Sequence, residues 1–434
     1  MTDVHQRLHR AFCEDDPAAF REVLAEHPEL RAKINDPVAA FDSPVINHVR
    51  SRAMLDAVLE AGADINAKSR WWAGGFGLLH SAAPDLAAYA IERGATVDVH
   101  AAARLGLIDK LRELIAGDPD LVHARGGDGQ TPLHFASTIE IAEFLLNHGA
   151  AIDIRDVDHV STPAQYMVRD RQEIVRFLIR RGCETDLLMA AALGDAALAR
   201  RHLDSDPDCI HLRVSDEYFP MIDSKCGGTI YQWTLGWYVS PHDVAREFGH
   251  MDVFQLLMDR SPPDARFIAA CWANDGTAVA ALLSENPGLV ASLSSTYRRH
   301  AAHAARNNKP GAVRAMLAAG LPVDATGQNG GTPLHWAAFH GNPEMTRDIL
   351  QFHPPLEVTD ADYHATPLGW AIYGSEHSWD PASGNYAATI EALLHAGIKV
   401  PEGTSGGTEA VKEVLRRHIN SGACLNTVSS LGGG

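Results

Sequence analysis

The chain has 434 residues, and its 37 lysines and arginines stand against 55 aspartates and glutamates, so its formal net charge is −18. Nucleic acid and anionic membrane surfaces carry negative charge, and this excess argues against both as partners. Hydrophobic residues make up 46% of the chain, which is ordinary for a protein with a sizeable core and argues against disorder.

Cysteine spacing and hydropathy exclude several further classes. The six cysteines contain no Cys-x-x-Cys pair, so we expect no disulfide framework, no metal site and no cofactor. No stretch approaches the ~20 apolar residues of a transmembrane helix. The first residues lack the apolar core of a secretory signal, and a cytoplasmic location, by default bacterial, is expected.

A short pattern returns along the chain. Residues 131–136 read Thr-Pro-Leu-His-Phe-Ala and residues 332–337 read Thr-Pro-Leu-His-Trp-Ala, with partial copies starting at Thr162 and Thr366. A second pattern, built around Gly-Ala and a following Asp or Asn, closes many of the units, as in 61–66 and 148–153. The spacing from one Thr-Pro to the next indicates a repeat of just over thirty residues.

The physical chemistry of one unit is legible in the sequence. Thr332 before a proline predicts a helix N-cap with proline at the first helical position, where a missing N–H costs nothing. A turn near Gly341 leads to a second helix over 345–352, with apolar residues at helical spacing. One such helix pair is too short to bury its own apolar faces, so the units must stack.

These motifs resemble those of the ankyrin-repeat family. The resemblance is strongest at 129–155 and 327–360, and it extends from residue 5 to about residue 400. It implies an all-α solenoid of roughly ten to twelve helix-turn-helix units with β-hairpin-like fingers. It also implies that the repeat histidines bond the backbone of the adjacent finger and are structural: His80, His134 and His335.

The period defines the expected organisation of the chain. We expect an N-terminal capping repeat, a first repeat block, an aromatic-rich insertion, a second repeat block whose last member carries an insertion between its helices, a capping helix and a flexible tail. Their ranges are 1–36, 37–214, 215–239, 240–403, 404–420 and 421–434. The capping helices themselves are expected at 4–24 and 408–419.

The insertion at 215–239 has two open interpretations. Its aromatic residues, among them Trp233, Trp237 and Tyr238, suit stacking on a ligand if they line a groove or form a lid. Alternatively, they pack on a neighbouring repeat as a small core of their own, because a long insertion must bury something to stay ordered. We slightly favour the second interpretation.

The last repeat carries the best candidate cluster for chemistry. Glu376 and His377 could do acid–base work if burial moves their pKa values apart, and Trp379 would supply an apolar wall. The stack should bring further polar and aromatic side chains to the same end of the concave face: Gln328, Asn329, Trp336, His340, Asp360, Asp362, Tyr363, Trp370 and Tyr373. A solvated helix end is the simpler explanation for Glu376 and His377. We likewise expect the charged side chains at 156–159 to be solvated finger tips.

The resemblance implies a scaffold that binds a protein or peptide partner on its concave face. We therefore expect a binding protein more than an enzyme. The charge of −18 favours a partner with a basic surface. The alternative is a small-molecule or carbohydrate pocket at the C-terminal end, in which Glu376 and His377 would be catalytic. The burial of Glu376 and His377 distinguishes the two hypotheses, because catalysis requires a pocket in which both side chains are buried.

Overall fold

The computed structural model describes residues 3–37 and 39–429, and within these ranges the chain is helical, with no β-strand. An isolated bridge between Ala39 and Ser43 is the one β-type contact there. No helix in the described part of the chain is long and apolar enough to cross a membrane. The all-α class expected from the sequence is therefore confirmed, whereas the solenoid form and its ten to twelve repeats stay predictions.

The chain divides into two compact units. The first comprises Met1–Met189 with Ser215–Thr234, and the second comprises Ala190–Val214 with Leu235–Gly434. The division falls inside the predicted insertion, so 215–234 folds with the first unit and 235–239 with the second. The insertion is therefore not a separate part of the molecule.

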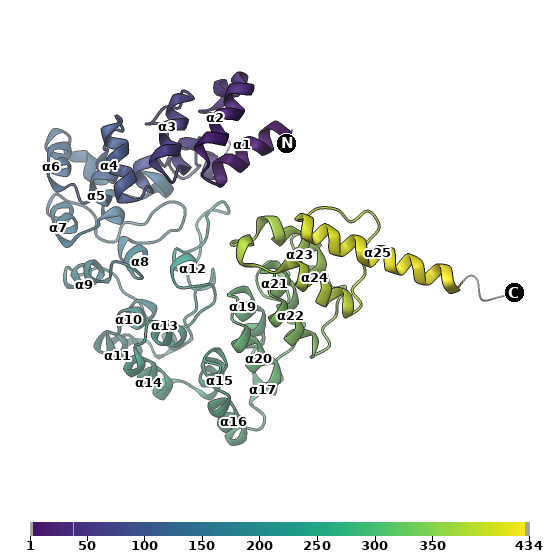
Figure 1. Ribbon diagram of the computed structural model, residues 1–434. Coiled ribbons are helices and arrows are strands. Elements are labelled where there is room, and N and C mark those ends of the chain that lie inside the picture. Colours follow the sequence, from purple (N-terminus) through teal and green to yellow (C-terminus); the bar gives the residue numbers. More distant parts are fainter. Residues whose placement is uncertain (1–2, 38, 430–434) are drawn as a thin grey trace. The chain divides into compact units, whose positions relative to one another are not determined.

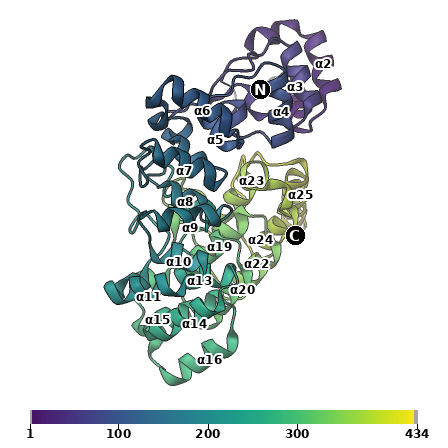
Figure 2. The same ribbon diagram turned by 90° about the vertical axis from the view of Figure 1, so that its left-hand side faces the viewer.

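The first unit consists of short helices in sequential pairs, and Figure 2 shows α7, α8 and α9 following one another. Its helices are α1 (Asp3–Cys13), α2 (Pro17–Glu26), α3 (Arg52–Glu60), α4 (Pro84–Glu92), α5 (Val99–Arg104), α6 (Ile108–Gly117), α7 (Ile139–Asn147), α8 (Pro163–Met167), α9 (Gln172–Arg180) and α12 (Tyr231–Thr234), while α10 (Leu187–Leu193) spans the division. Two helices stand where we expected one over 4–24. Asp16 accepts hydrogen bonds from the backbone of Ala18 and Ala19 and so starts a new helix at Pro17.

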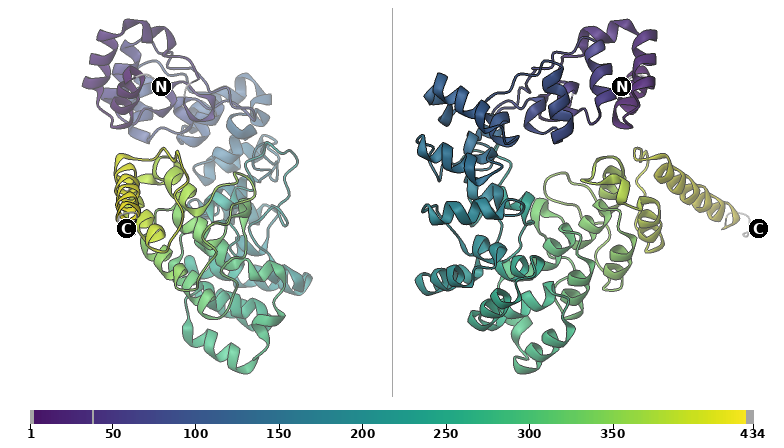
Figure 3. Two further views of the ribbon diagram at one scale, coloured as in Figure 1. Left: turned by 90° about the vertical axis from the view of Figure 1, so that its right-hand side faces the viewer. Right: turned by 60° about the vertical axis from the view of Figure 1, so that its left-hand side comes forward.

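The second unit is a layered stack, visible in Figures 1 and 3. Its helices are α11 (Ala196–Ser205), α13 (Pro241–Glu247), α14 (Met251–Arg260), α15 (Pro263–Trp272), α16 (Gly276–Glu285), α17 (Leu289–Ser292), α18 (Ser295–Arg298), α19 (His300–Arg306), α20 (Pro310–Ala318), α21 (Pro333–Phe339), α22 (Pro343–Leu350), α23 (Pro367–His377), α24 (Tyr386–His395) and α25 (Glu409–Ser429). One row is formed by α19, α21 and α23, and a second by α20, α22 and α24. Small residues such as Ala337 and Ala371, both fully buried, let neighbouring helices of the first row approach closely.

The repeat histidines tie successive units together. His134 Nε2 lies 3.2 Å from the Ser161 carbonyl oxygen, and His335 Nε2 lies 3.1 Å from that of Ala365. These contacts confirm the structural role expected for both side chains. His80 differs, because its Nε2 lies 3.0 Å from the carboxylate of Asp98.

The fingers, expected to be β-hairpin-like, are tight turns without an assigned strand in the described residues. Backbone hydrogen bonds close them, such as 2.8 Å from the Gly126 N–H to the Gln130 carbonyl and 2.9 Å from the Gly327 N–H to the Gly331 carbonyl. Asn329 lies inside such a turn with φ of 60°. A loop of five residues reverses the chain before a ladder of paired residues can form.

The C-terminal helix is longer than expected. It was predicted at 408–419, before a flexible tail, but α25 continues to Ser429. No proline interrupts this stretch, so every residue in it keeps a backbone N–H for the helix. It packs against α24 through Val411, Val414 and Leu415. The remainder of the predicted tail, 430–434, lies outside the described residues.

Candidate functional site

One arginine of the second unit lies among three tryptophans. The guanidinium carbon of Arg306 is 4.8 Å from the ring centre of Trp379, 5.3 Å from that of Trp237 and 5.5 Å from that of Trp336. We call these four residues the Arg306 cluster. Their separation in sequence is large, so only the stacking of units brings them together.

Successive elements of the stack position the cluster. Arg306 ends α19 and Trp336 lies in α21, which packs beside it. The extra residues after α23 carry Trp379 back over Trp336, with ring centres 5.8 Å apart and planes 29° apart. Asn307 Nδ2 donates to the Trp237 carbonyl at 2.6 Å and so holds the end of the insertion against α19.

The charge of Arg306 is buried without a carboxylate partner. The residue is 7% exposed, donates from Nε to the side-chain oxygen of Gln328, and forms no ion pair with any described residue. Burial lowers the pKa of Arg306 to about 9. The faces of the three indole rings supply the attraction that a carboxylate would otherwise provide.

The Arg306 cluster continues into a strip of aromatic rings. Trp336 contacts Trp370 at 4.8 Å between ring centres, and Trp370 contacts Tyr363 at 6.5 Å. The middle of this strip is buried and its ends are not, because Tyr363 is 68% exposed and Trp379 is 52% exposed. We call Tyr363, Trp370, Trp336 and Trp379 the aromatic strip. It presents two exposed rings on a rigid base.

Two of the predicted polar residues have structural tasks. Asp360 is buried and accepts hydrogen bonds from Trp370 Nε1 at 2.9 Å and from the backbone of Asp362, Tyr363 and Ala365. Burial alone would raise the pKa of Asp360, but these hydrogen bonds hold it below its ordinary value. His340 Nε2 lies 2.7 Å from the Arg306 carbonyl oxygen and ties α21 to α19.

The other predicted residues differ in their burial and position. Asp362 and Tyr373 are exposed at the same end of the unit, and Gln328 and Asn329 are half-buried in a finger. Tyr238 is buried and stacks on His303, with ring centres 3.7 Å apart. Trp233 is exposed but lies in the first unit, so it does not join the Arg306 cluster.

Glu376 and His377 lack the enclosure that acid–base chemistry requires. Both side chains are exposed at the end of α23. A Glu376 carboxylate oxygen accepts from the Gly407 N–H at 3.2 Å, and His377 Nδ1 lies 3.2 Å from the Tyr373 carbonyl oxygen in its own helix. The pair is a solvated helix end, which was the simpler of our two interpretations.

The aromatic insertion is partly a small core and partly exposed. Tyr231 is fully buried and its hydroxyl donates to Asp186 at 3.0 Å, while Trp237 and Tyr238 are buried in the second unit. Tyr218 and Trp233 stay exposed. The packing interpretation describes the buried part of the insertion, and stacking of its exposed rings on a ligand stays a prediction.

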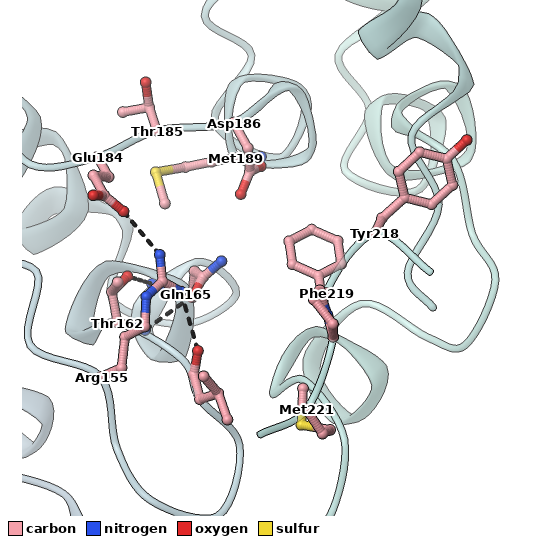
Figure 4. Close-up of a pocket in the computed structure, with 12 residues that line it drawn as sticks. Arg155, Thr162, Gln165, Glu184, Thr185, Asp186, Met189, Tyr218, Phe219 and Met221 are labelled. Carbon is pink, nitrogen blue, oxygen red and sulfur yellow. Dashed lines mark hydrogen bonds and ion pairs between the residues drawn. The ribbon is translucent and has the colours of Figure 1, made fainter. Parts of the chain in front are cut away.

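The first unit contains a pocket of about 400 Å³ beside this insertion. In Figure 4 the Phe219 ring lies on the insertion side, across from Gln165 and Met189. An exposed ion pair of 2.8 Å joins Arg155 to Glu184 at its rim. The remaining lining residues are Val160, Thr162, Thr185, Asp186, Tyr218, Pro220 and Met221. The volume suits a small molecule or a single peptide side chain.

The expectation of solvated finger tips at 156–159 is wrong. Asp156 and Asp158 are each 3% exposed and His159 is 9% exposed. The backbone of the insertion covers them, since the Gly227 N–H donates to Asp158 at 2.9 Å and the Gly228 carbonyl lies 2.7 Å from His159 Nδ1. This contact joins residues 69 positions apart, and no local pattern announces it.

Comparison with known proteins finds similarity to a repeat family in two stretches of the chain. The family model described as ankyrin repeats (3 copies) matches residues 99–189 and 300–402. A curated mouse protein, ankyrin repeat and SAM domain-containing protein 6, is 27% identical over 154 residues, which are 35% of this chain and 17% of that protein. Mouse palmitoyltransferase ZDHHC13 is 40% identical over 73 residues, which are 17% of this chain and 10% of that protein. The chain therefore spans less than a fifth of the length of either relative.

Proposed function

Because this chain contains ankyrin repeats, which generally mediate contacts between proteins, we propose that it is a scaffold for a protein or peptide partner. The partner binds the face formed by α19, α21 and α23, which the sequence predicts to be concave. The observation that carries the proposal is Trp379, 52% exposed and stacked on the buried Trp336. A large ring held rigid on a buried base loses little entropy when a partner covers it, as binding hot spots require.

The charge around the exposed rings sets the chemistry of the partner. Asp362, Glu376 and Asp380 are exposed in the last repeat, the same repeat that carries Tyr363, Tyr373 and Trp379. Carboxylates among aromatic rings favour lysine and arginine side chains. Such a side chain binds a carboxylate by charge and an aromatic ring by cation–π contact. The net charge of −18 acts in the same direction at long range. We therefore propose a partner segment with basic residues.

The pocket beside the insertion supports a second candidate function, the binding of a small molecule in the first unit. Its 400 Å³ falls within the range of small-ligand sites, and Phe219 provides an aromatic wall. This second candidate is tested by screening a metabolite panel in a thermal-shift assay, with Phe219→Ala as the comparison. A ligand that stabilises the unaltered chain and not the variant would support this candidate, and no stabilisation by any compound would argue against it.

Selection of peptides on the full-length chain tests the scaffold proposal. A library of random twelve-residue peptides is displayed on phage, and an enriched peptide is titrated by fluorescence anisotropy against unaltered protein, Trp379→Ala and Trp233→Ala. We expect enriched peptides to contain lysine or arginine. The Trp379 variant should bind at least about tenfold more weakly, which is about 1.4 kcal/mol.

Trp233→Ala is the matched control, because Trp233 is 59% exposed but lies in the other unit. Its affinity should equal that of the unaltered chain. Enrichment of acidic or uncharged peptides would contradict the proposed chemistry. Equal affinity of all three proteins for the enriched peptides would place their site elsewhere.

A further inference from the structure

Two carboxylates and an imidazole of the first unit converge in the protein interior. His159 Nε2 lies 3.7 Å from Asp158 Oδ2 and 3.8 Å from Asp128 Oδ2. The three groups each offer one potential ligand atom, and these atoms lie within 4.8 Å of one another. Asp128 comes from the turn Gly127–Gly129 and the other two from the next finger. Successive repeats thus contribute to one cluster, which we call the 128/158/159 cluster.

The protein does not fully balance the negative charge of this cluster, because His159 offers at most one positive charge against two carboxylates. Asp128 is 8% exposed and Asp158 is 3% exposed, and no lysine or arginine of the described residues pairs with either carboxylate. Asp128 Oδ1 is buried with no hydrogen-bond partner, and its Oδ2 receives one long contact of 3.4 Å from Gln130. A buried carboxylate in this state is costly unless it is neutralised by a proton or a cation.

The hydrogen bond of His159 determines which of its ring nitrogens carries a proton. Its Nδ1 lies 2.7 Å from the Gly228 carbonyl oxygen, which can only accept, so Nδ1 carries the proton of this hydrogen bond. In the neutral imidazole, Nε2 then has no proton, and its lone pair is directed toward two carboxylates. Separations of 3.7 and 3.8 Å are too long for hydrogen bonds. A backbone carbonyl that fixes the tautomer in this way is the usual outer contact of a metal-binding histidine.

We propose that Asp128 Oδ2, Asp158 Oδ2 and His159 Nε2 bind a divalent first-row transition-metal cation. Two bonds of about 2.1 Å at an angle of about 110–130° place their donor atoms about 3.4–3.8 Å apart. The distances from His159 Nε2 to the two carboxylates, 3.7 and 3.8 Å, fall in this range. One imidazole with two carboxylates suits zinc or manganese better than calcium, which prefers oxygen ligands alone.

The surrounding backbone builds the site. The N–H groups of Val157 and Asp158 both donate to the Asp128 carbonyl, at 2.8 and 3.1 Å, and this holds the two fingers together. A side chain at Gly129 would begin 2.3 Å from Val157, so glycine permits this close approach. The Gly227 N–H holds the other oxygen of Asp158 at 2.9 Å. The insertion therefore contributes to the site through its backbone.

A second group of similar composition in the same unit provides a contrast. His80, Asp98 and His100 also lie within 4.8 Å, but Asp98 accepts from Lys68 Nζ at 2.8 Å and contacts His80 Nε2 at 3.0 Å. His100 Nε2 lies 3.0 Å from the Ala124 carbonyl oxygen. These internal contacts occupy the Asp98 carboxylate, His80 Nε2 and His100 Nε2. It offers a matched control for substitutions in the 128/158/159 cluster.

Calorimetric titration of the full-length chain tests the proposal. Protein stripped of metal by a chelator is titrated with Zn²⁺ and, separately, with Mn²⁺, Ca²⁺ and Mg²⁺. We expect one equivalent of Zn²⁺ or Mn²⁺ to bind and to raise the thermal unfolding midpoint. Asp128→Asn and His159→Gln should each weaken binding at least about tenfold, by the loss of one ligand, whereas His100→Gln should bind like the unaltered chain.

Folding of the variants is checked by circular dichroism. Asp128→Asn removes a buried charge that lacks a partner, so we expect this variant to fold. If His159→Gln does not fold, the binding measured with Asp128→Asn decides the test. Absence of Zn²⁺ and Mn²⁺ binding to the unaltered chain would overturn the proposal. Binding of calcium or magnesium alone, or equal binding by Asp128→Asn and the unaltered chain, would also overturn it.

Discussion

At the scale of single residues, buried neutral histidines are a recurrent feature. Burial lowers the pKa of His134, His242 and His303 to about 3 each, and nearby arginines lower it further. Each lies in a different repeat of the chain, and each is at most 5% exposed. A protonated imidazole would carry an uncompensated charge in these positions. The fold therefore depends on their neutral form.

Acid should weaken the protein through these three histidines. The unfolded histidines have a pKa near 6.5 and the folded ones near 3, so below pH 6.5 the unfolded chain binds more protons. The stabilisation is complete above pH 6.5 and is lost as the pH falls toward 3. We expect the loss to reach about 1 kcal/mol per histidine for each pH unit below 6.5.

Urea unfolding at pH 7.5, 6.5 and 5.5 measures this dependence. His242→Gln is the informative variant, because the amide can still contact Ser261, which now lies 2.7 Å from His242 Nε2. Its unfolding midpoint should fall less between pH 6.5 and 5.5 than that of the unaltered chain. A midpoint that does not change over this range would contradict the prediction.

At the scale of elements, close helix packing supports the aromatic strip. Helices α21 and α23 touch where Gly374 faces the backbone of Phe339. A Cβ at Gly374 would lie 2.5 Å from the Phe339 carbonyl oxygen, and backbone cannot move aside as a flexible side chain can. The missing side chain is therefore what allows Trp336 and Trp370 to meet.

We expect Gly374→Ala to lower the free energy of unfolding by about 1–3 kcal/mol, since overpacking forces the two helices apart. Gly276→Ala is the control, because a Cβ at Gly276 meets nothing within 4 Å. Its stability should stay within about 0.5 kcal/mol of that of the unaltered chain. Urea unfolding measures both, and equal stabilities of the two variants would refute the proposed contact.

At the scale of the whole molecule, the net charge of −18 acts on partners before they make contact. A peptide with several lysines should associate with this chain faster than an uncharged peptide, because the protein's field steers it. Salt screens this field over about 10 Å at 0.1 M. The enriched peptide from the selection described above provides the probe.

Stopped-flow association at 50 and 500 mM NaCl measures the effect. We expect the rate constant to fall about tenfold or more for the basic peptide. Replacement of its lysines by glutamine gives the control, whose rate should depend little on salt. A basic peptide whose association rate is insensitive to salt would exclude long-range steering.

The local chemistry of each repeat was predictable from the sequence. The Thr332 cap before a proline, the glycine turn at Gly341 and the structural His335 all need only neighbours within one repeat period. Such patterns report backbone geometry that is decided within a few residues. The helical class and the solvated position of Glu376 follow from the same short-range patterns.

The candidate sites depended on contacts that no local pattern specifies. Trp237 and Arg306 are 69 positions apart, and the insertion reaches His159 from a similar distance. The sequence alone therefore determined the helical repeat and its caps, because these obey local hydrogen bonding. Tertiary structure alone decided that Asp158 and His159 are buried and that Arg306 lies among tryptophans, because burial depends on which distant segment covers a side chain.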